Sequence, residues 1–444
     1  MTTFSAVITT GIYCRPGCGA RPNAENVRTF EHPAAAEAAG FRACLQCRPY
    51  RVAGAVPWNA PELVCRAVRL ILDGVLDTGS EAELGRRLGL SSRHLRRLFH
   101  EHLGLTPDQL ARSRRAHFAR RMLDDTDLTV ADVAFASGFG SLRQFNRTMR
   151  EIFRHSPQDL RRRRRRADRI ATDGGLALRL PVSADYDWAA AVGLLAREAI
   201  PGVEAVEGGT YRRTITLDGA PGLLEVHGVG GYLVVHAHLP FWEGLIHAME
   251  RVRRMLGLDF DLEPALAHFA ADPVLGPLVK ARPGLRVPGA WGPFEAAVRV
   301  VIGRHHADPQ RLMGVLAKTF GTPVPGLPHG LSHAFPAPEV IADADLRAAG
   351  LPVKVAATVS GFAAAVVDGG IRLDGSVGLD VLVAALTSVT GINAATAQRV
   401  AIRLGERDAY PLGDPALPDA AAAEGWRPWR ALAATHLTEN ADVS

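Results

Sequence analysis

Lysine is scarce in this sequence, and several other absences also narrow its function. Only three of the 51 basic residues are lysines, so nearly all of the positive charge is arginine. Five cysteines in 444 residues are too few for a disulfide scaffold, and none follows Cys65. The two longest charge-free stretches, 319–338 and 381–398, are broken by prolines in the first and by a Gly-Ile-Asn turn and hydroxyl side chains in the second. We therefore expect no membrane-spanning helix.

The N-terminus also lacks a targeting signal. Residues 1–13 contain no basic residue and no long apolar run, so we expect a cytoplasmic protein rather than a secreted one. Hydrophobic residues make up 47% of the chain and charged residues 22%, which is typical of globular proteins and excludes overall disorder. At about 150 residues per domain, the length corresponds to about three domains, or four if some are small.

The positive charge is concentrated in one block. Residues 86–166 contain 20 arginines and 8 acidic residues, a balance of +12, whereas the rest of the chain has a balance of −7. A basic block in an otherwise acidic chain indicates a localised contact with a polyanion.

Changes in composition and periodicity predict four modules in a mainly α fold with α+β parts. The expected boundaries are 1–57, 58–166, 172–262 and 263–444. The third module contains predicted strands at 214–217 and 232–236 and predicted helices at 188–199 and 241–256. Alanine-rich helices separated by Pro/Gly loops follow in the fourth module.

Four of the cysteines form two close pairs, Cys-x3-Cys and Cys-x2-Cys, with 25 residues between the pairs. Thiolates at this spacing can surround one tetrahedral Zn²⁺. We therefore predict one zinc ion with four ligands: Cys14, Cys18, Cys44 and Cys47. The alternative is a closed zinc site that only holds a small domain together.

The residues around these cysteines resemble a known family. The segments Thr10–Cys18 (TGIYCRPGC) and Ala39–Pro49 (AGFRACLQCRP) closely resemble the methylphosphotriester-sensing domain of Ada-type proteins. The resemblance implies that Cys14 irreversibly accepts a methyl group from an alkylated DNA phosphate. Zinc-bound thiolates are deprotonated and nucleophilic at neutral pH. Methylation removes one negative charge, so repulsion of the DNA backbone weakens and DNA affinity rises.

The arginine-rich block contains two similar units, at 84–99 and 130–147, each with a helix, a glycine turn and a second helix. In both units the second helix carries basic and amide side chains on one face, which suits the DNA major groove. A single charge run is usually a solvated face, but two units of this kind favour DNA binding.

This block resembles an AraC-type DNA-binding domain over about residues 62–162, through Leu103–Pro107 (LGLTP), Gly138–Phe139 and Ser156–Leu160 (SPQDL). The resemblance implies recognition helices at about 92–102 and 141–153. The side chains expected to contact bases or phosphates are Arg93, His94, Arg96 and Arg97 on the first helix, and Arg143, Gln144, Asn146 and Arg147 on the second. The run 161–166 either grips phosphates or forms a solvated linker.

The C-terminal half resembles AlkA-type 3-methyladenine glycosylases over about residues 176–440. The motifs occur in the family's order: Leu180–Pro181, Tyr186–Trp188, Gly202–Glu204, Arg282–Gly289, Phe294–Glu295, Ala409–Pro415 and Trp426–Arg430. The resemblance implies an α+β domain like the AlkA N-terminal domain, followed by an all-α helix-hairpin-helix domain. Proteins of this family flip an alkylated base into a pocket.

By that resemblance Asp414 is the catalytic aspartate, which stabilises the cationic sugar as the base departs. The hairpin is Val389–Ala397, whose backbone amides bind a phosphate of the damaged strand, with Gly391 and Asn393 at its turn. Asn393 replaces a glycine, and we expect the left-handed conformation that asparagine tolerates. His305 occupies the position implied to wedge into the duplex.

The implied base pocket departs from the family. The positions where the family has stacking aromatic side chains hold Ala395, Arg399, Pro415 and Thr438. No lysine occupies the hairpin, so we expect no Schiff-base strand cleavage. The absence of cysteine after Cys65 excludes an iron–sulfur cluster. This half is therefore either a catalytic glycosylase or a catalytically degenerate module that only binds DNA.

Together these features predict a DNA alkylation-damage response protein with three activities. They are methyl transfer to a zinc-bound cysteine, sequence-specific transcription activation and excision of alkylated bases such as 3-methyladenine. The expected partners are double-stranded DNA and RNA polymerase, with nucleoid association, one zinc ion and no small-molecule cofactor. The alternative is a methylation-switched regulator with a degenerate C-terminal half. A metabolite-responsive AraC regulator is disfavoured because no cupin-like ligand domain is visible.

Overall fold

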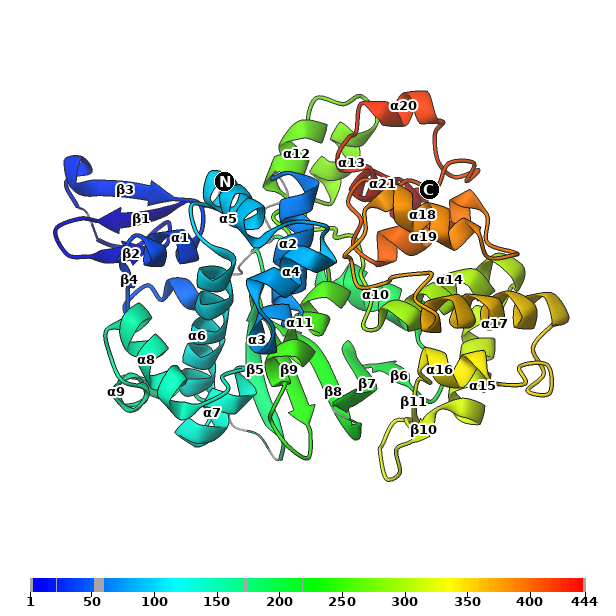
Figure 1. The fold of residues 1–444 in the computed structure, drawn as a ribbon, viewed down its shortest axis with the longest axis horizontal. Coiled ribbons are helices and arrows are strands. Elements are labelled where there is room, and N and C mark those ends of the chain that lie inside the picture. Colours follow the sequence, from blue (N-terminus) through cyan, green and yellow to red (C-terminus); the bar gives the residue numbers. More distant parts are fainter. Residues whose placement is uncertain are drawn as a thin grey trace.

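The computed structural model describes residues 3–20, 22–51, 60–170, 172, 174–217 and 219–441. It confirms the predicted fold class, a mainly α chain with two α+β parts. Figure 1 shows a small sheet at one end of the molecule, helices of the C-terminal half at the other, and a larger sheet between them. The described helices include none that is long and apolar enough to span a membrane.

The N-terminal segment, here called the zinc module (residues 3–51), forms a four-stranded sheet in the order β3-β1-β2-β4. Its elements are β1 (Phe4–Val7), β2 (Ile12–Cys14), η1 (Ala24–Asn26), β3 (Val27–Phe30), α1 (Pro33–Ala38), β4 (Arg42–Ala43) and η2 (Pro49–Arg51). Strands β1 and β2 are antiparallel, whereas β2 and β4 are parallel. The parallel pairing brings the ends of β2 and β4, and with them both cysteine pairs, to the same edge of the sheet.

The arginine-rich block folds into eight helices. They are α2 (Glu62–Leu72), α3 (Val75–Thr78), α4 (Glu81–Arg87), α5 (Ser92–Leu103), α6 (Pro107–Asp125), α7 (Val130–Ala136), α8 (Leu142–Phe153) and α9 (Pro157–Arg162). Both predicted glycine turns are confirmed, because Gly89 and Gly138 adopt left-handed φ values of 72° and 77°. Ser91 and Ser141 cap α5 and α8 by accepting a hydrogen bond from the backbone three residues on. The recognition helices therefore lie where the sequence predicts them.

A five-stranded antiparallel sheet follows, in the order β5-β9-β8-β7-β6. Its elements, with the preceding turn η3 (Arg166–Asp168), are β5 (Leu176–Pro181), α10 (Trp188–Glu198), β6 (Glu204–Glu207), β7 (Thr210–Leu217), β8 (Ala220–Val229), β9 (Tyr232–His238) and α11 (Leu245–Met255). The predicted strands lie within β7 and β9. The helix predicted over 241–256 begins only at Leu245, because Gly244 directly before it has a φ of 75° and interrupts the helix.

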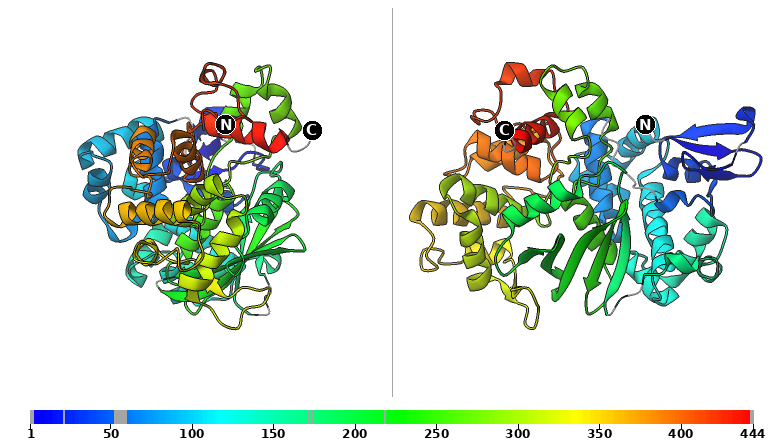
Figure 2. Two further views of the ribbon diagram at one scale, coloured as in Figure 1. Left: turned by 90° about the vertical axis from the view of Figure 1, so that its right-hand side faces the viewer. Right: turned by 180° about the vertical axis from the view of Figure 1, so that it is seen from behind.

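The remaining chain is helical except for a short ribbon of β10 (Thr322–Pro323) and β11 (His333–Ala334). The helices are α12 (Glu263–Phe269), α13 (Leu275–Ala281), α14 (Pro293–His305), α15 (Pro309–Phe320), α16 (Pro338–Ala342), α17 (Val353–Val367), α18 (Leu379–Thr387), α19 (Ala394–Arg403), α20 (Ala420–Glu424) and α21 (Arg430–Ala441). Figure 2 shows α12, α13, α20 and α21 grouped on the same side of the molecule, although they are distant in sequence.

The hydrophobic cores cross from one segment of the chain to another. One core joins the zinc module, the α6–α9 helices and the five-stranded sheet, for example through Tyr13, Phe153 and Leu178. A second joins α2–α5 to α12, α13 and α21, for example through Cys65 and Phe269. The third lies within α14–α19 and the loop before β6. Cys65, the cysteine outside the four-cysteine cluster, is fully buried in the second core.

Two buried carboxylates at the end of α6 hold three segments together. Asp124 accepts hydrogen bonds from the Tyr50 hydroxyl at 3.0 Å and from Arg51 at 3.2 Å, and it also pairs with Arg120. Asp125 accepts hydrogen bonds from Arg51 at 2.8 Å and from Arg179 of β5 at 3.1 Å. The zinc module, the helical block and the five-stranded sheet thus share one ionic junction.

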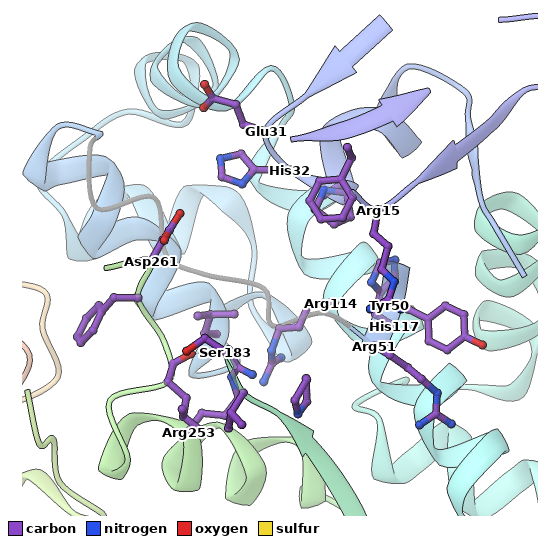
Figure 3. Close-up of a pocket in the computed structure, with 18 of the residues that line it drawn as sticks. Arg15, Glu31, His32, Tyr50, Arg51, Arg114, His117, Ser183, Arg253 and Asp261 are labelled. Atoms are coloured by element: carbon purple, nitrogen blue, oxygen red, sulfur yellow. Dashed lines mark hydrogen bonds between the residues drawn. The ribbon is translucent and has the colours of Figure 1, made fainter. Parts of the chain in front are cut away.

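Next to this junction lies a cavity of about 1040 Å³ between the zinc module, α6 and the sheet. Figure 3 shows Arg15 and His32 entering it from the zinc module, Arg114 from α6 and Arg253 from α11. Arg114 donates a hydrogen bond to Asp77 at 3.2 Å. The zinc module, α6 and the five-stranded sheet, which meet at the ionic junction, therefore also line a common cavity.

Removing the Asp124 carboxylate should destabilise the whole chain. In Asp124→Leu, Arg120, whose side chain is 2% exposed, keeps its charge without a buried counter-ion. We expect the free energy of unfolding to fall by about 3–5 kcal/mol. Asp127→Asn is the matched control, because Asp127 is 48% exposed and its ion pairs with Arg164 and Arg169 should contribute at most about 1 kcal/mol. Denaturant unfolding measures both variants, and equal losses would contradict the role of the junction.

Candidate zinc centre, DNA-binding helices and base-excision site

The four predicted zinc ligands come together at the edge of the small sheet. Cys14 ends β2, Cys18 lies in the turn after it, and Cys44 and Cys47 follow β4. The four sulfur atoms all lie within 4.8 Å of one another. In a tetrahedral zinc site with bonds of about 2.3 Å, sulfur atoms lie about 3.8 Å apart. The cluster is therefore positioned to bind one metal ion.

The electrostatics of the cluster also fit a bound cation. Burial and the neighbouring cysteine sulfurs raise the pKa of the Cys14 thiol far above its ordinary value. Burial also raises the pKa of Cys47, to about 12. Cys14 and Cys47 therefore resist losing their protons unless a cation compensates the charge, as Zn²⁺ does. Of the four, Cys14 is the most buried, at 7% exposure.

The residue next to Cys14 ties the zinc module to the long helix α6. The Tyr13 hydroxyl donates a hydrogen bond to Glu37 Oε1 at 2.6 Å, and His117 Nε2 on α6 lies 2.5 Å from the same oxygen. Tyr13 is fully buried, and burial next to Glu37 raises the pKa of its hydroxyl well above the ordinary value. The cysteine-bearing edge of the sheet is thus fixed to the helical block.

On α5 the predicted DNA-contacting residues lie on the outer face. Arg93, Arg96 and Arg97 are exposed, and His94 is half-buried. Arg96 pairs with Glu81 of α4, which fixes the direction of its guanidinium. The inner face carries Leu95 and Phe99, both buried in the core. Arg97 Nη2 lies 3.5 Å from His94 Nε2, so these two predicted residues contact each other on the exposed face.

On α8 three of the four predicted residues border a groove of about 550 Å³. Arg143 and Arg147 are exposed and line it, whereas Gln144 is half-buried and does not. Asn146 also lines the groove, but its amide donates a hydrogen bond to Leu142 O at 2.8 Å, so part of its donor capacity is used within the helix.

Two further arginines on this groove, Arg150 and Arg154, were missed by the sequence analysis. They follow Arg143 and Arg147 at steps of three and four residues, and residues at this spacing lie on the same face of a helix. This spacing could have identified them from the sequence. Arg154 also donates a hydrogen bond to Gly40 O of the zinc module at 3.3 Å. Arg154 therefore links the second recognition helix to the zinc module.

The arginine run 161–166 is mostly exposed, and two of its side chains contact other segments of the chain. Arg164 donates to Thr126 O at 3.0 Å and pairs with Asp127 at 2.7 Å. Arg165 donates to Gln46 O, between two zinc-ligand cysteines, at 3.5 Å. Arg164 and Arg165 therefore also have a structural role, and phosphate binding by the run stays a prediction.

The hairpin turn keeps one glycine for steric reasons. Gly391 has a φ of 95°, and a Cβ atom there would lie 2.2 Å from Thr358 Oγ1. The expected left-handed conformation of Asn393 is wrong, because its φ is −91°. Asn393 instead caps α19, and its Oδ1 accepts a hydrogen bond from Thr396 N at 2.9 Å. His305 Nε2 lies 2.9 Å from Gly391 O, which places His305 beside this turn.

Asp414 lies in the loop between α19 and α20. Its Oδ1 accepts a hydrogen bond from Ala416 N at 3.1 Å, and its Oδ2 contacts Arg399 Nη2 of α19. Burial raises the pKa of Asp414, but the hydrogen bonds from Arg399 and Ala416 outweigh this effect and leave the pKa below its ordinary value. Asp414 is therefore an anion at neutral pH, and its side chain is 10% exposed.

Comparison with known proteins finds relatives of the zinc module, the helical block and the C-terminal half. Family models match residues 2–50 (metal binding domain of Ada), 84–163 (helix-turn-helix domain) and 177–292 (AlkA N-terminal domain). The chain is 28% identical to DNA-3-methyladenine glycosylase 2 of Escherichia coli, over 57% of this chain and 93% of that protein. It is 32% identical to the bifunctional transcriptional activator/DNA repair enzyme Ada of Escherichia coli, over 35% of this chain and 45% of that protein.

One relative matches almost the whole chain. It is the probable bifunctional transcriptional activator/DNA repair enzyme AlkA of Mycobacterium tuberculosis, which is 36% identical over 97% of this chain and 91% of its own length. The match runs through the zinc module, the helical block and the C-terminal half together. The chain therefore belongs to the family of bifunctional transcriptional activator/DNA repair enzymes AlkA.

Proposed function

We propose that this chain repairs alkylated DNA by two chemistries and activates transcription in response to the damage. The observation that carries the proposal is the gathering of four cysteine sulfurs beside two helix-turn-helix units. The relative matched over 97% of the chain is named both a transcriptional activator and a DNA repair enzyme. As an activator, the chain would contact RNA polymerase and remain associated with the nucleoid.

The first chemistry is methyl transfer to Cys14. Its thiolate attacks the methyl carbon of a DNA methylphosphotriester, so that a C–S bond forms and the C–O bond breaks. The phosphodiester anion leaves, and Cys14 becomes a neutral thioether. Zinc, when bound, keeps the four sulfurs deprotonated and fixes their positions. No group in the reaction regenerates the thiolate, so each chain reacts once.

The methyl group changes the charge that the zinc module presents to DNA. Four thiolates on Zn²⁺ carry a net charge of about −2, and methylation reduces this to about −1. Because phosphate contacts dominate nucleic-acid affinity, the change favours DNA binding. The Tyr13–Glu37–His117 contacts and the Arg154–Gly40 hydrogen bond keep this charge close to α6 and α8. The charge of the zinc centre would therefore affect the affinity of DNA bound at the recognition helices.

The second chemistry is hydrolysis of an N-glycosidic bond at Asp414. A negative carboxylate next to a flipped nucleotide stabilises the positive charge that develops on the sugar. The amides of the Gly391 turn and the start of α19 would hold a backbone phosphate of the damaged strand. The alternative of a catalytically degenerate half is not favoured, because the relatives matched here are named repair enzymes or glycosylases.

Peptide mapping identifies the acceptor cysteine. After incubation of the zinc-loaded chain with methylphosphotriester DNA, we expect S-methylation on Cys14 alone, because the resemblance assigns it that role. Unmodified DNA is the control and should leave all the cysteines without a methyl group. A methyl group on Cys18, Cys44 or Cys47 would reassign the nucleophile.

Base release tests Asp414. We expect Asp414→Asn to reduce the release of damaged bases by roughly 100- to 1,000-fold, because the substitution removes the charge that stabilises the sugar cation. Asp380→Asn removes an exposed carboxylate from the same half and should change the rate less than twofold. Chromatographic quantification of released bases measures both variants, and equal rates in the two would exclude the proposed role.

Binding titrations test the recognition helices. With a DNA site selected from random sequence by the wild-type chain, we expect Arg143→Ala to weaken binding by about 5- to 160-fold, which corresponds to about 1–3 kcal/mol for a base contact. Arg311→Ala is the control, because this exposed arginine lies on α15, outside the two helix-turn-helix units. Fluorescence anisotropy gives both affinities. Unchanged binding by Arg143→Ala would show that Arg143 does not contact the selected DNA site.

A further inference from the structure

The cavity between the zinc module, α6 and the five-stranded sheet has a basic side. One face of α6 lines it, with residues at steps of three and four: Leu110, Arg114, His117 and Arg121. Arg253 of α11 lines the same cavity. Figure 3 shows Arg114 and Arg253 at one side of the cavity and Glu31 and His32 at the other. The basic side is therefore formed by α6 and α11.

Several arginines that line the cavity are neutralised by carboxylates of the chain. Arg51 and Arg179 donate hydrogen bonds to Asp125 at 2.8 and 3.1 Å. Arg253 pairs with Glu250 at 3.4 Å. These guanidinium groups therefore have counter-ions without any ligand.

Arg121 has no such counter-ion in the described part of the chain. Its guanidinium lies 5.6 Å from the centre of the Phe118 ring, and no described residue pairs with it or accepts a hydrogen bond from it. Burial and the nearby charge of Arg253 lower the pKa of Arg121 to about 10, so the side chain stays protonated at neutral pH. The Nη2 atom of Arg114 is also buried, and among the residues that the structure describes it has no hydrogen-bond acceptor. Both side chains line the cavity and can donate hydrogen bonds to a ligand there.

Another wall of the cavity is apolar. It is formed by Val68 and Leu72 of α2 and by Leu258, Phe260 and Leu262, which lie between α11 and α12. The volume of about 1040 Å³ is sufficient for a small molecule, because ligand sites commonly measure about 300–1,000 Å³. A ligand that satisfies the whole cavity therefore combines an anionic group with an apolar body.

We propose that this cavity binds a small organic anion, whose carboxylate or phosphate group pairs with Arg121 and Arg114 and whose apolar body packs against α2 and the segment before α12. Guanidinium groups bind carboxylates and phosphates through paired N–H donors. Because three segments line the cavity, the bound anion holds the zinc module against α6 and the sheet. The ligand takes no part in either repair reaction. No sequence motif indicates the site, because its residues come from distant segments.

Calorimetric titration of the zinc-loaded full chain with three naphthalene derivatives tests the proposal. The probes are 1-naphthoate, 1-naphthyl phosphate and neutral 1-naphthol, so the apolar body stays constant while the anionic group changes. We expect at least one of the two anions to bind at one molecule per chain. Arg121→Gln should weaken this binding about tenfold or more, because it removes the charged donor, and should leave the affinity for 1-naphthol unchanged.

Two further variants serve as controls. Arg121→Lys keeps the charge but loses the paired donors, so its affinity should lie between those of wild type and Arg121→Gln. Arg311→Gln removes an exposed arginine on α15, far from the cavity lining, and should bind the probes as wild type does. The anion that binds more tightly identifies the anionic group as a carboxylate or a phosphate.

Thermal unfolding provides a second measurement. Without a probe, the Tm of Arg121→Gln should equal or exceed that of wild type, because the substitution breaks no ion pair. A saturating anion should raise the Tm of wild type more than that of Arg121→Gln. The proposal is wrong if neither anion binds saturably, if wild type and Arg121→Gln bind both anions equally, or if Arg121→Gln is less stable without a probe. The first two results would mean that water alone fills the basic side of the cavity, and the third that Arg121 already has a partner within the chain.

Discussion

The arrangement of this chain depends on the two buried carboxylates at the end of α6. Asp124 and Asp125 are at most 1% exposed, and arginines from the zinc module, from α6 and from β5 converge on them. Buried charges are tolerated only when counter-charges and hydrogen bonds satisfy them, so the three segments must dock together or leave ions unpaired. The junction thereby fixes the zinc module against the helices that carry the recognition residues.

A second contact surface joins the regulatory half to the repair half. Arg69 of α2 donates a hydrogen bond to Glu406 at 3.3 Å, and Arg66 donates to Ser376 O at 3.0 Å. Around them, α2 shares a hydrophobic core with α12, α13 and α21. The zinc module, the helix-turn-helix units and the C-terminal half therefore share hydrophobic cores. A change of charge at the zinc centre therefore occurs in a module that is packed directly against the helical block.

The sequence was sufficient for the parts that rest on local patterns. Cysteine spacing located the zinc ligands, and Gly89 and Gly138 located turns that require left-handed backbone. The sequence was not sufficient where contacts in the folded chain determine the conformation or the partner of a residue. Asn393 is a helix cap because its Oδ1 accepts a hydrogen bond from Thr396 N. The hydrogen bonds of Arg164 and Arg165 could not be predicted, because Thr126 and Gln46 are distant from them in sequence. The partner of Asp414 could not be predicted either, because Arg399 is 15 residues away and meets it only in the fold.

The central claim is that one chain performs one stoichiometric and one catalytic repair reaction. The most direct test supplies excess DNA that contains both methylphosphotriesters and damaged bases, and follows methyl uptake and base release in the same tube. The account predicts that methyl uptake stops at one group per chain while base release continues through many turnovers. Base release that stops with methyl uptake, or methyl uptake beyond one group per chain, would contradict it.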